Sequence, residues 1–241
     1  MLYTLAHILR DKLPLVWYVV DTVNSKLFYV RYGKRLRAFK FSVVPEGYLY
    51  MPISEIATDR LVKFFDHQPE EAYKFFKPHG FDAESIKKLQ KNKSFLAYVL
   101  IDESNGNIAG YCFNRAFFFG KGFRGRMVDI DYRGRGLGTT MNRMLNEVGF
   151  GIGLRLFETV SKDNVASYRS AVSASAFKVV KKLPHNELYL EILNEMKQNE
   201  EDGLTSVMRR GGGVINCVLV CYSKYSIGLN RQPYLMVRRA E

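Results

Sequence analysis

The apolar residues near the start of the chain recur at helical spacing. The pattern includes Leu13, Val16, Val20, Val23, Leu27 and Val30 and predicts a helix over 13–32. Asp11 and Pro14 stand near its start, and Gly33 stands where a stop is expected. A segment rich in Lys and Arg follows at 31–40. An apolar helix beside basic residues suits an anionic membrane surface. The alternative is that the apolar stripe packs on the body of the protein and the basic segment is solvated.

The rest of the chain alternates between strand and helix patterns. Strands are expected at 48–53, 94–103, 108–120, 123–131 and 154–160, and in a final pair "FKVVKKL" and "ELYLEIL". Helices are expected within 59–91, after the glycine-rich segment at 134–138, and from "SKDNVASYRSAV" onward. The Asn-Gly in "SNGN" indicates a hairpin turn between two strands. This order predicts an α/β fold of the α+β type, with a mixed sheet flanked by helices.

Three regions are expected. Residues 1–46 hold the N-terminal amphipathic helix and the basic segment, 47–195 form the main domain, and 196–241 form an extension. The extension has a charged linker, a "RRGGG" hinge and the apolar run "VINCVLVCY". We expect this extension either to add a strand to the sheet or to make a contact between copies of the chain, and the second alternative would give a homodimer.

The composition favours a soluble protein with an anionic partner. Of 241 residues, 36 are Lys or Arg and 24 are Asp or Glu, a net charge of +12. The basic residues are spread along the chain and no nucleic-acid motif is present, so nucleic acid is not expected as a partner. Three cysteines without a Cys/His cluster predict neither a disulfide framework nor a metal site. No stretch reaches the length of about 18 apolar residues of a membrane span. We expect a cytoplasmic location, with a peripheral membrane contact through the first helix as an open addition.

The segment "DYRGRGLGTT" at 131–140 carries the strongest signal for function. It has neither the lysine of a phosphate-binding P-loop nor the glycine spacing of a dinucleotide fingerprint. Three glycines between a strand and a helix still let main-chain N–H groups converge on an anion, and the helix N-terminus adds its positive end. Arg133 and Arg135 can supplement that charge.

The same residues resemble the signature of the GNAT superfamily of acyl-CoA-dependent N-acetyltransferases. The motif Q/R-x-x-G-x-G/A falls on Arg133, Gly136 and Gly138, and Asn164 lies at the expected distance, after the next strand. The resemblance covers about residues 48–193. It implies a mostly antiparallel sheet that splays between its fourth and fifth strands, with the coenzyme in the split.

The resemblance also implies a set of coenzyme contacts for acetyl-CoA as co-substrate. The pyrophosphate would lie on the loop, and the main chain at the end of the preceding strand would pair with the pantetheine arm, near Asn164. The residues so implied are Met127, Val128, Asp129, Arg133, Gly134, Arg135, Gly136, Leu137, Gly138, Thr139 and Asn164.

The catalytic groups are less determined. An amine that attacks the thioester must lose a proton, and the departing thiolate must gain one. Glu158, His79 and Asp129 are candidate bases, Glu158 first because partial burial would raise its pKa. Relatives place a Tyr seven residues after the Asn, where this chain has Ala171. Tyr168, about one turn earlier, or water would serve as the acid.

The acceptor is expected to be the primary amine of a small molecule. The aromatic and basic segment at 64–81 suits an amino sugar, including one carried on a nucleotide. The alternative is a non-catalytic acyl-CoA sensor or interaction module of the same fold, which the alanine at position 171 favours.

Overall fold

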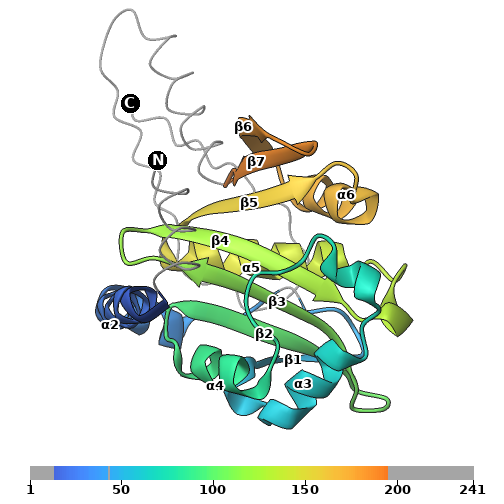
Figure 1. Cartoon of the computed structure of the whole chain (residues 1–241), viewed down its shortest axis with the longest axis horizontal. Coiled ribbons are helices and arrows are strands. Elements are labelled where there is room, and N and C mark those ends of the chain that lie inside the picture. Colours follow the sequence, from blue (N-terminus) through green and yellow to red (C-terminus); the bar gives the residue numbers. More distant parts are fainter. Residues whose placement is uncertain (1–13, 43, 195–241) are drawn as a thin grey trace, which may run out of the picture. The chain divides into compact units, whose positions relative to one another are not determined.

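The computed structural model describes residues 14–42 and 44–194. In these residues seven strands form one open sheet in the order β1-β2-β3-β4-β5-β7-β6 (Figure 1). The strands are β1 (Tyr48–Pro52), β2 (Phe95–Asp102), β3 (Ile108–Ala116), β4 (Lys121–Val128), β5 (Arg155–Ser161), β6 (Phe177–Leu183) and β7 (Glu187–Ile192). All neighbouring pairs are antiparallel except β4 with β5. The mixed, mostly antiparallel sheet is the one that the sequence predicted.

Five α-helices and three short 3₁₀ helices lie among the described residues. The α-helices are α2 (Pro14–Ala38), α3 (Thr58–Asp66), α4 (Ala83–Lys91), α5 (Leu137–Ile152) and α6 (Val165–Ala174). The 3₁₀ helices are η1 (Ile53–Glu55), η2 (Glu70–Tyr73) and η3 (Ile130–Tyr132). Figure 1 shows α3 and α4 over the part of the sheet formed by β1 to β3, while α6 lies beside β5. None of the described helices is long and apolar enough to cross a membrane.

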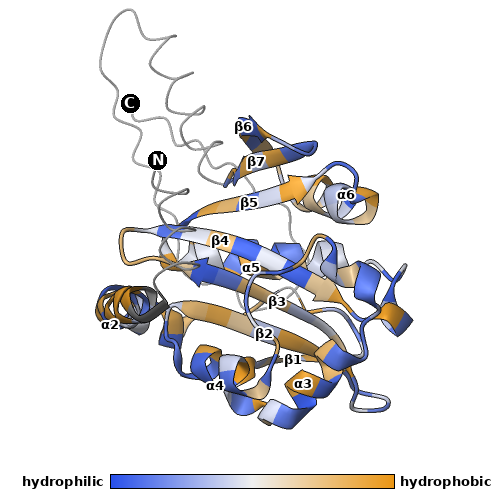
Figure 2. Cartoon of the chain, viewed as in Figure 1, coloured by the Kyte–Doolittle hydropathy of each residue, from blue (hydrophilic) through white to orange (hydrophobic). Residues whose placement is uncertain are grey.

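Two apolar clusters lie on opposite faces of the sheet. One joins α5 and α2 to the sheet through residues such as Met141, Leu145 and Phe28. The other joins α3 and α4 through residues such as Leu61, Phe65 and Ile86. Every residue of β2 is buried, because this strand carries helices on both faces (Figure 2).

Several boundaries differ from the sequence prediction. The strand expected over 123–131 begins at Lys121 and ends at Val128, and Ile130–Tyr132 form a 3₁₀ helix. The first helix continues through Gly33 to Ala38, because Tyr32 and Leu36 on either side of Gly33 pack in the apolar cluster around α5, and this tertiary packing overrides the weak helix propensity of glycine. The basic segment is thus mostly helical. The strand expected over 108–120 ends at Ala116, and Phe117 to Gly120 form the turn into β4.

The chain divides into two compact units, residues 1–199 and 200–241. Helix α2 is therefore part of the same unit as the sheet. The second unit lies outside the described residues, and so does the predicted role of 196–241.

Candidate functional site: a split between two strands

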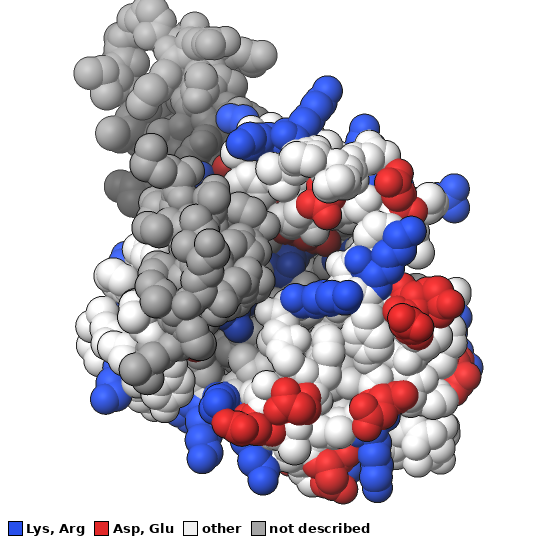
Figure 3. Space-filling model, viewed as in Figure 1, with Lys and Arg blue, Asp and Glu red and all other residues white. Residues whose placement is uncertain are grey.

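Strands β4 and β5 diverge after a short stretch of pairing. They pair at three positions, ending with Phe123 opposite Phe157. Beyond this point, within residues 14–42 and 44–194, β5 pairs only with β7, and β4 only with β3. A space-filling view shows a hollow near the centre of this face, with Lys or Arg atoms inside and along its edge (Figure 3). The expected splay is present at the expected strands.

The main-chain N–H and C=O groups of β4 are directed alternately toward β3 and toward the split. Asp129 donates its N–H to Ala109 on β3, whereas Gly120 accepts from Arg155 on β5. Successive residues of a strand direct their N–H and C=O groups to opposite edges. The main-chain N–H and C=O groups of the odd-numbered residues of β4 are therefore directed toward β3. The main-chain groups that face the split past the last β4–β5 pair belong to Arg124, Arg126 and Val128.

The glycine loop joins the open end of β4 to α5. Gly134 and Gly136 have φ angles of 79° and 77°, and a Cβ at either would meet open space. Gly136 is the N-cap of α5, with no side chain capping the helix and no acidic residue in its first turn. The first amides of a 16-residue helix are thus available to an anion beside an exposed loop.

A buried ion network fills the closed end of the split. Both oxygens of Glu158 on β5 accept hydrogen bonds at 2.6 Å, one from Nε of Arg124 and one from Nη1 of Arg126, both on β4. Arg126 also donates to Ser167 and Ser170 on α6. The side chain of Arg126 thus joins β4, β5 and α6. Two guanidinium groups against one carboxylate give this network a net charge of +1.

The pKa of Glu158 differs from the sequence expectation. Burial by itself raises this pKa, but the charges of Arg126 and Arg124 and their hydrogen bonds outweigh it, so the pKa is lowered from 4.5. The expectation of a raised pKa was wrong, because it considered burial without the two arginines. Burial lowers the pKa of Arg124, whose Nη2 atom has no hydrogen-bond partner in the part of the chain that the structure describes. Neither arginine was singled out from the sequence, although their alternation in "FRGRMV" was visible.

Helix α6 brings the two other sequence candidates beside the split. The Asn164 side chain caps α6 by accepting from the N–H of Ser167. Tyr168 is partly buried and packs against the apolar cluster around α5. Ala171, at the position where relatives have Tyr, is buried and offers no hydroxyl.

His79 lies away from the split, in an aromatic cluster on the other face of the sheet. Its ring contacts Phe65, Phe81 and Tyr111 among others. Nε2 lies 2.9 Å from the Tyr111 hydroxyl and Nδ1 lies 2.8 Å from the Gly80 carbonyl. Burial lowers the pKa of His79 to about 4. A neutral ring with Nδ1–H donating to Gly80 and Nε2 accepting from Tyr111 fits this environment and supports a structural role.

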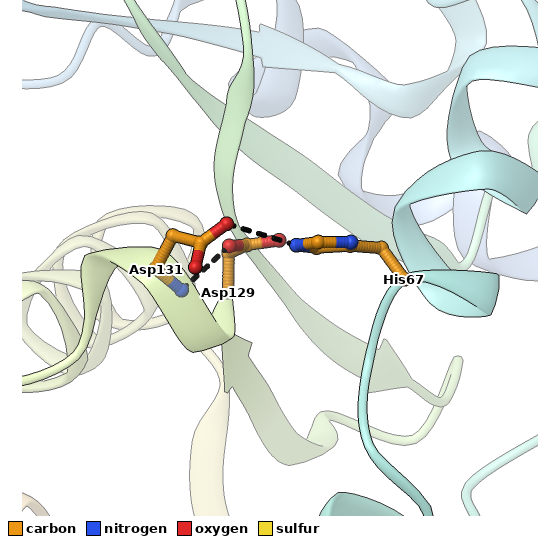
Figure 4. A group of neighbouring side chains, drawn as sticks. All are labelled: His67, Asp129 and Asp131. Carbon is orange, nitrogen blue, oxygen red and sulfur yellow. Dashed lines mark hydrogen bonds and ion pairs between the residues drawn. The ribbon is translucent and has the colours of Figure 1, made fainter.

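Asp129 holds the turn between β4 and the loop. One carboxylate oxygen accepts from the N–H of Asp131 (Figure 4). The other accepts from the side-chain amide of Gln68, just after the end of α3. Gln68 also accepts from the N–H of Ile130, and His67 pairs with Asp131 at 2.9 Å. Gln68 and His67, which no sequence motif marked, thus connect the end of α3 to the start of the loop.

His67, Asp129 and Asp131 offer ligand atoms within 4.8 Å of one another. His67 and Asp131 are exposed and pair with each other. The Asp129 carboxylate accepts a hydrogen bond from Gln68, so the atoms that would bind a metal already have protein partners. We assign no metal to this group.

Comparisons with known proteins agree with the geometry of the fold. No family model matches the chain, and no curated protein matches it in sequence. The ribosomal-protein-S5-alanine acetyltransferase from Vibrio fischeri is 16% identical over 64% of this chain and 93% of its own, with a TM-score of 0.51. The GNAT domain of S. lividans PAT is 14% identical over 59% of this chain and 88% of its own, with a TM-score of 0.51. A GNAT-family acetyltransferase from Bacillus anthracis is 18% identical over 64% of this chain and 98% of its own, with a TM-score of 0.50.

These likenesses show that the chain has the fold of the GNAT acetyltransferases. The resemblance inferred from the glycine loop is confirmed at the level of the fold.

Proposed function

We propose that the protein is an acyl-CoA-dependent N-acetyltransferase. The observation that carries the proposal is the split, whose free β4 edge leads into a glycine loop and an uncapped helix N-terminus. A coenzyme with an anionic pyrophosphate and a peptide-like arm suits these two features. The acetyltransferase names of the structures that share the fold support the same conclusion.

The main chain supplies most of the coenzyme contacts in this proposal. The main-chain N–H groups from Gly134 to Thr139 donate to the pyrophosphate, and Arg133 adds positive charge. Thr139 contributes less than the others, because its N–H already donates to Gly136. The arm pairs with the edge of β4, chiefly at Val128 and Arg126, since the main-chain groups of Met127 and Asp129 are directed toward β3. Asn164 lies at the start of α6 near the same arm.

The reaction is a direct attack of an amine nitrogen on the thioester carbonyl, with cleavage of the C–S bond. The basic atoms of Glu158, His79 and Asp129 already accept hydrogen bonds. We therefore assign the amine proton to water and treat Glu158 as a positioning residue that holds both arginines. The positive network at the closed end of the split favours the oxyanion that forms on the carbonyl. Tyr168 is the candidate acid that protonates the thiolate.

The proposed acceptor is the primary amine of a small molecule. The segment at 64–81, which suggested an amino sugar, uses much of its aromatic surface in the core, since Phe64 and Phe65 are buried. Lys74, Phe75 and Lys77 are exposed and keep the basic and aromatic character. An acceptor screen covers amino sugars, their nucleotide-linked forms, and peptide amines, because the Vibrio fischeri protein is named for an alanine of a ribosomal protein.

Thermal unfolding with and without acetyl-CoA tests the coenzyme site, with free CoA and ATP as comparisons. A ligand at 100 times its dissociation constant adds about 2.7 kcal/mol to stability. We expect a shift with both CoA species and none with ATP. No shift with any of them would overturn the proposal.

A pair of glycine variants assigns that shift to the loop. Gly136→Ala and Gly106→Ala introduce the same strain, because the two glycines have φ angles of 77° and 74° and open space around them, but Gly106 lies in the β2–β3 hairpin. We expect only Gly136→Ala to weaken coenzyme binding. A tenfold loss would reduce the ligand-induced gain by about 1.4 kcal/mol.

The alternative function is a non-catalytic acyl-CoA sensor, which the buried alanine at 171 supports. Thiol release from acetyl-CoA across the acceptor screen separates the two. Coenzyme binding without thiol release for any amine would favour the sensor.

A further inference from the structure

The outward face of α2 is apolar and exposed. Surface helices of globular proteins normally present charged and polar residues to solvent, yet Val30 is 84% exposed and Val23 is 50% exposed. Figure 2 shows α2 in the colour of apolar residues at the edge of the fold. The exposed apolar side chains of α2 are Val16, Tyr18, Val19, Val20, Val23, Leu27, Tyr29 and Val30.

The helix binds the body of the protein through a different face. Phe28 and Tyr32 are buried in the apolar cluster around α5. Asn24 is also buried, and its amide donates to Ser94 and to the carbonyl of Ala116. At 100° per residue, Val16, Val20, Val23, Leu27 and Val30 form a stripe whose centre lies about 120° around the helix from these contacts. The exposed stripe is therefore not required to attach α2.

Two phenylalanines of the β3–β4 turn extend this surface. Phe118 and Phe119 are 42% and 54% exposed. The turn is fixed to α2, because Asn24 accepts from the N–H of Phe118 and Arg31 donates to its carbonyl. The valine and leucine stripe, with Phe118 and Phe119, is called the α2 surface below.

The exposed charges of α2 are all positive. They belong to Lys26, Lys34 and three arginines, Arg31, Arg35 and Arg37. The acidic residue of the described part of α2, Asp21, is partly buried and accepts from Asn92. The surface thus combines exposed aliphatic and aromatic groups with cations only, which is the composition that anionic lipid headgroups and acyl chains match.

We propose that the α2 surface rests on an anionic lipid bilayer, with the apolar stripe at the headgroup boundary. A second copy of this chain fits less well, because a two-fold contact through α2 would bring the same cations together. The C-terminal residues 200–241 also carry a net positive charge, with six Lys or Arg against four Asp or Glu. The proposal rests on α2 and not on the acetyltransferase assignment.

Co-sedimentation with lipid vesicles tests the proposal. The full chain is mixed with vesicles of phosphatidylcholine alone and with vesicles that also contain phosphatidylserine. We expect binding to the anionic vesicles that weakens as salt is raised. No binding to either vesicle, or equal binding to both, would overturn the proposal.

Two variants locate the contact. Leu27→Glu with Val30→Glu places charge in the stripe and should abolish binding. Val179→Glu with Val180→Glu is the control, because these valines of β6 are also exposed, at 43% and 46% against 44% for Leu27 and 84% for Val30, and lie outside the α2 surface. Unchanged binding by the first pair, or equal loss in both pairs, would contradict the assignment. Light scattering of each protein without lipid measures its oligomeric state. If the unchanged chain is a dimer and only the Leu27→Glu with Val30→Glu variant is a monomer, the surface is instead a contact between copies.

A charge variant keeps the test valid if the first pair folds poorly. Lys26→Gln with Lys34→Gln leaves the stripe intact. Each lysine near an anionic surface contributes on the order of 1 kcal/mol, so binding should weaken roughly fivefold per lysine. Binding as tight as that of the unchanged chain would show that the cations of α2 take no part.

Discussion

The buried pair of arginines around Glu158 gives a sharp prediction for stability. Glu158→Gln keeps the size of the side chain and removes its charge. The carboxylate is 4% exposed and accepts from Arg124 and Arg126, whose side chains are 0% and 6% exposed. The variant leaves two guanidinium groups in the same buried space with no carboxylate bound to either.

The cost follows from burial. Removing one partner of a buried ion pair typically costs about 3–5 kcal/mol, because the remaining charge is uncompensated. Glu191→Gln is the control on the neighbouring strand β7. Glu191 pairs with Arg155 at 2.6 Å, but the Arg155 side chain is 64% exposed, and such a pair contributes about 0–1 kcal/mol.

The effect also depends on pH. The pKa of Glu158 in the folded protein is lowered from 4.5, so the charged form favours folding at pH values above 4.5. This contribution is lost as pH falls below 4.5 toward the folded pKa, where the carboxylate takes up a proton. The stability difference between the unchanged chain and Glu158→Gln should therefore be constant near neutral pH and shrink in acid.

Urea unfolding of the three proteins at pH 7 and at a series of acid values measures these differences. A Glu158→Gln loss below about 1 kcal/mol, equal to that of Glu191→Gln, would refute the buried network. A difference that grows as the pH falls would refute the direction of the pKa shift.

Two further predictions concern the candidate catalytic residues. Tyr168→Phe should lower the rate of thiol release by about a hundredfold or more if the hydroxyl is the acid, while acetyl-CoA stabilises the variant as before; an unchanged rate would assign protonation of the thiolate to water. His79 should stay neutral from pH 8 to pH 5 in the folded protein, because burial lowers its pKa to about 4, and the stability it contributes as a neutral ring should be lost as pH falls from about 6.5 toward 4. NMR of the histidine ring measures this, and a titration midpoint near 6.5 would contradict its place in the aromatic core.

Much of the site's framework was predictable because its signals are local. Gly134 and Gly136 adopt positive φ angles in a short loop between a strand and a helix, and the spacing of glycines in "RGRGLG" already indicated this turn. The Asn-Gly hairpin and the alternation of strands and helices also depend on neighbours in the sequence. These features predicted the order of the elements, and the splayed pair of strands was implied by the resemblance to the GNAT superfamily.

The roles of the charged residues depended on contacts between distant elements. Glu158 meets Arg124 and Arg126 only because β5 lies beside β4 and α6 closes over them, so its lowered pKa could not be predicted from neighbouring residues in the sequence. His79 is neutral because strands β2 and β3 and helix α3 enclose it in aromatic rings. Gly33 lies inside a helix because Tyr32 and Leu36 on either side of it pack in the apolar cluster around α5. Local sequence thus determined where the chain turns and pairs, while burial and charge, which depend on tertiary packing, determined what each candidate residue can do.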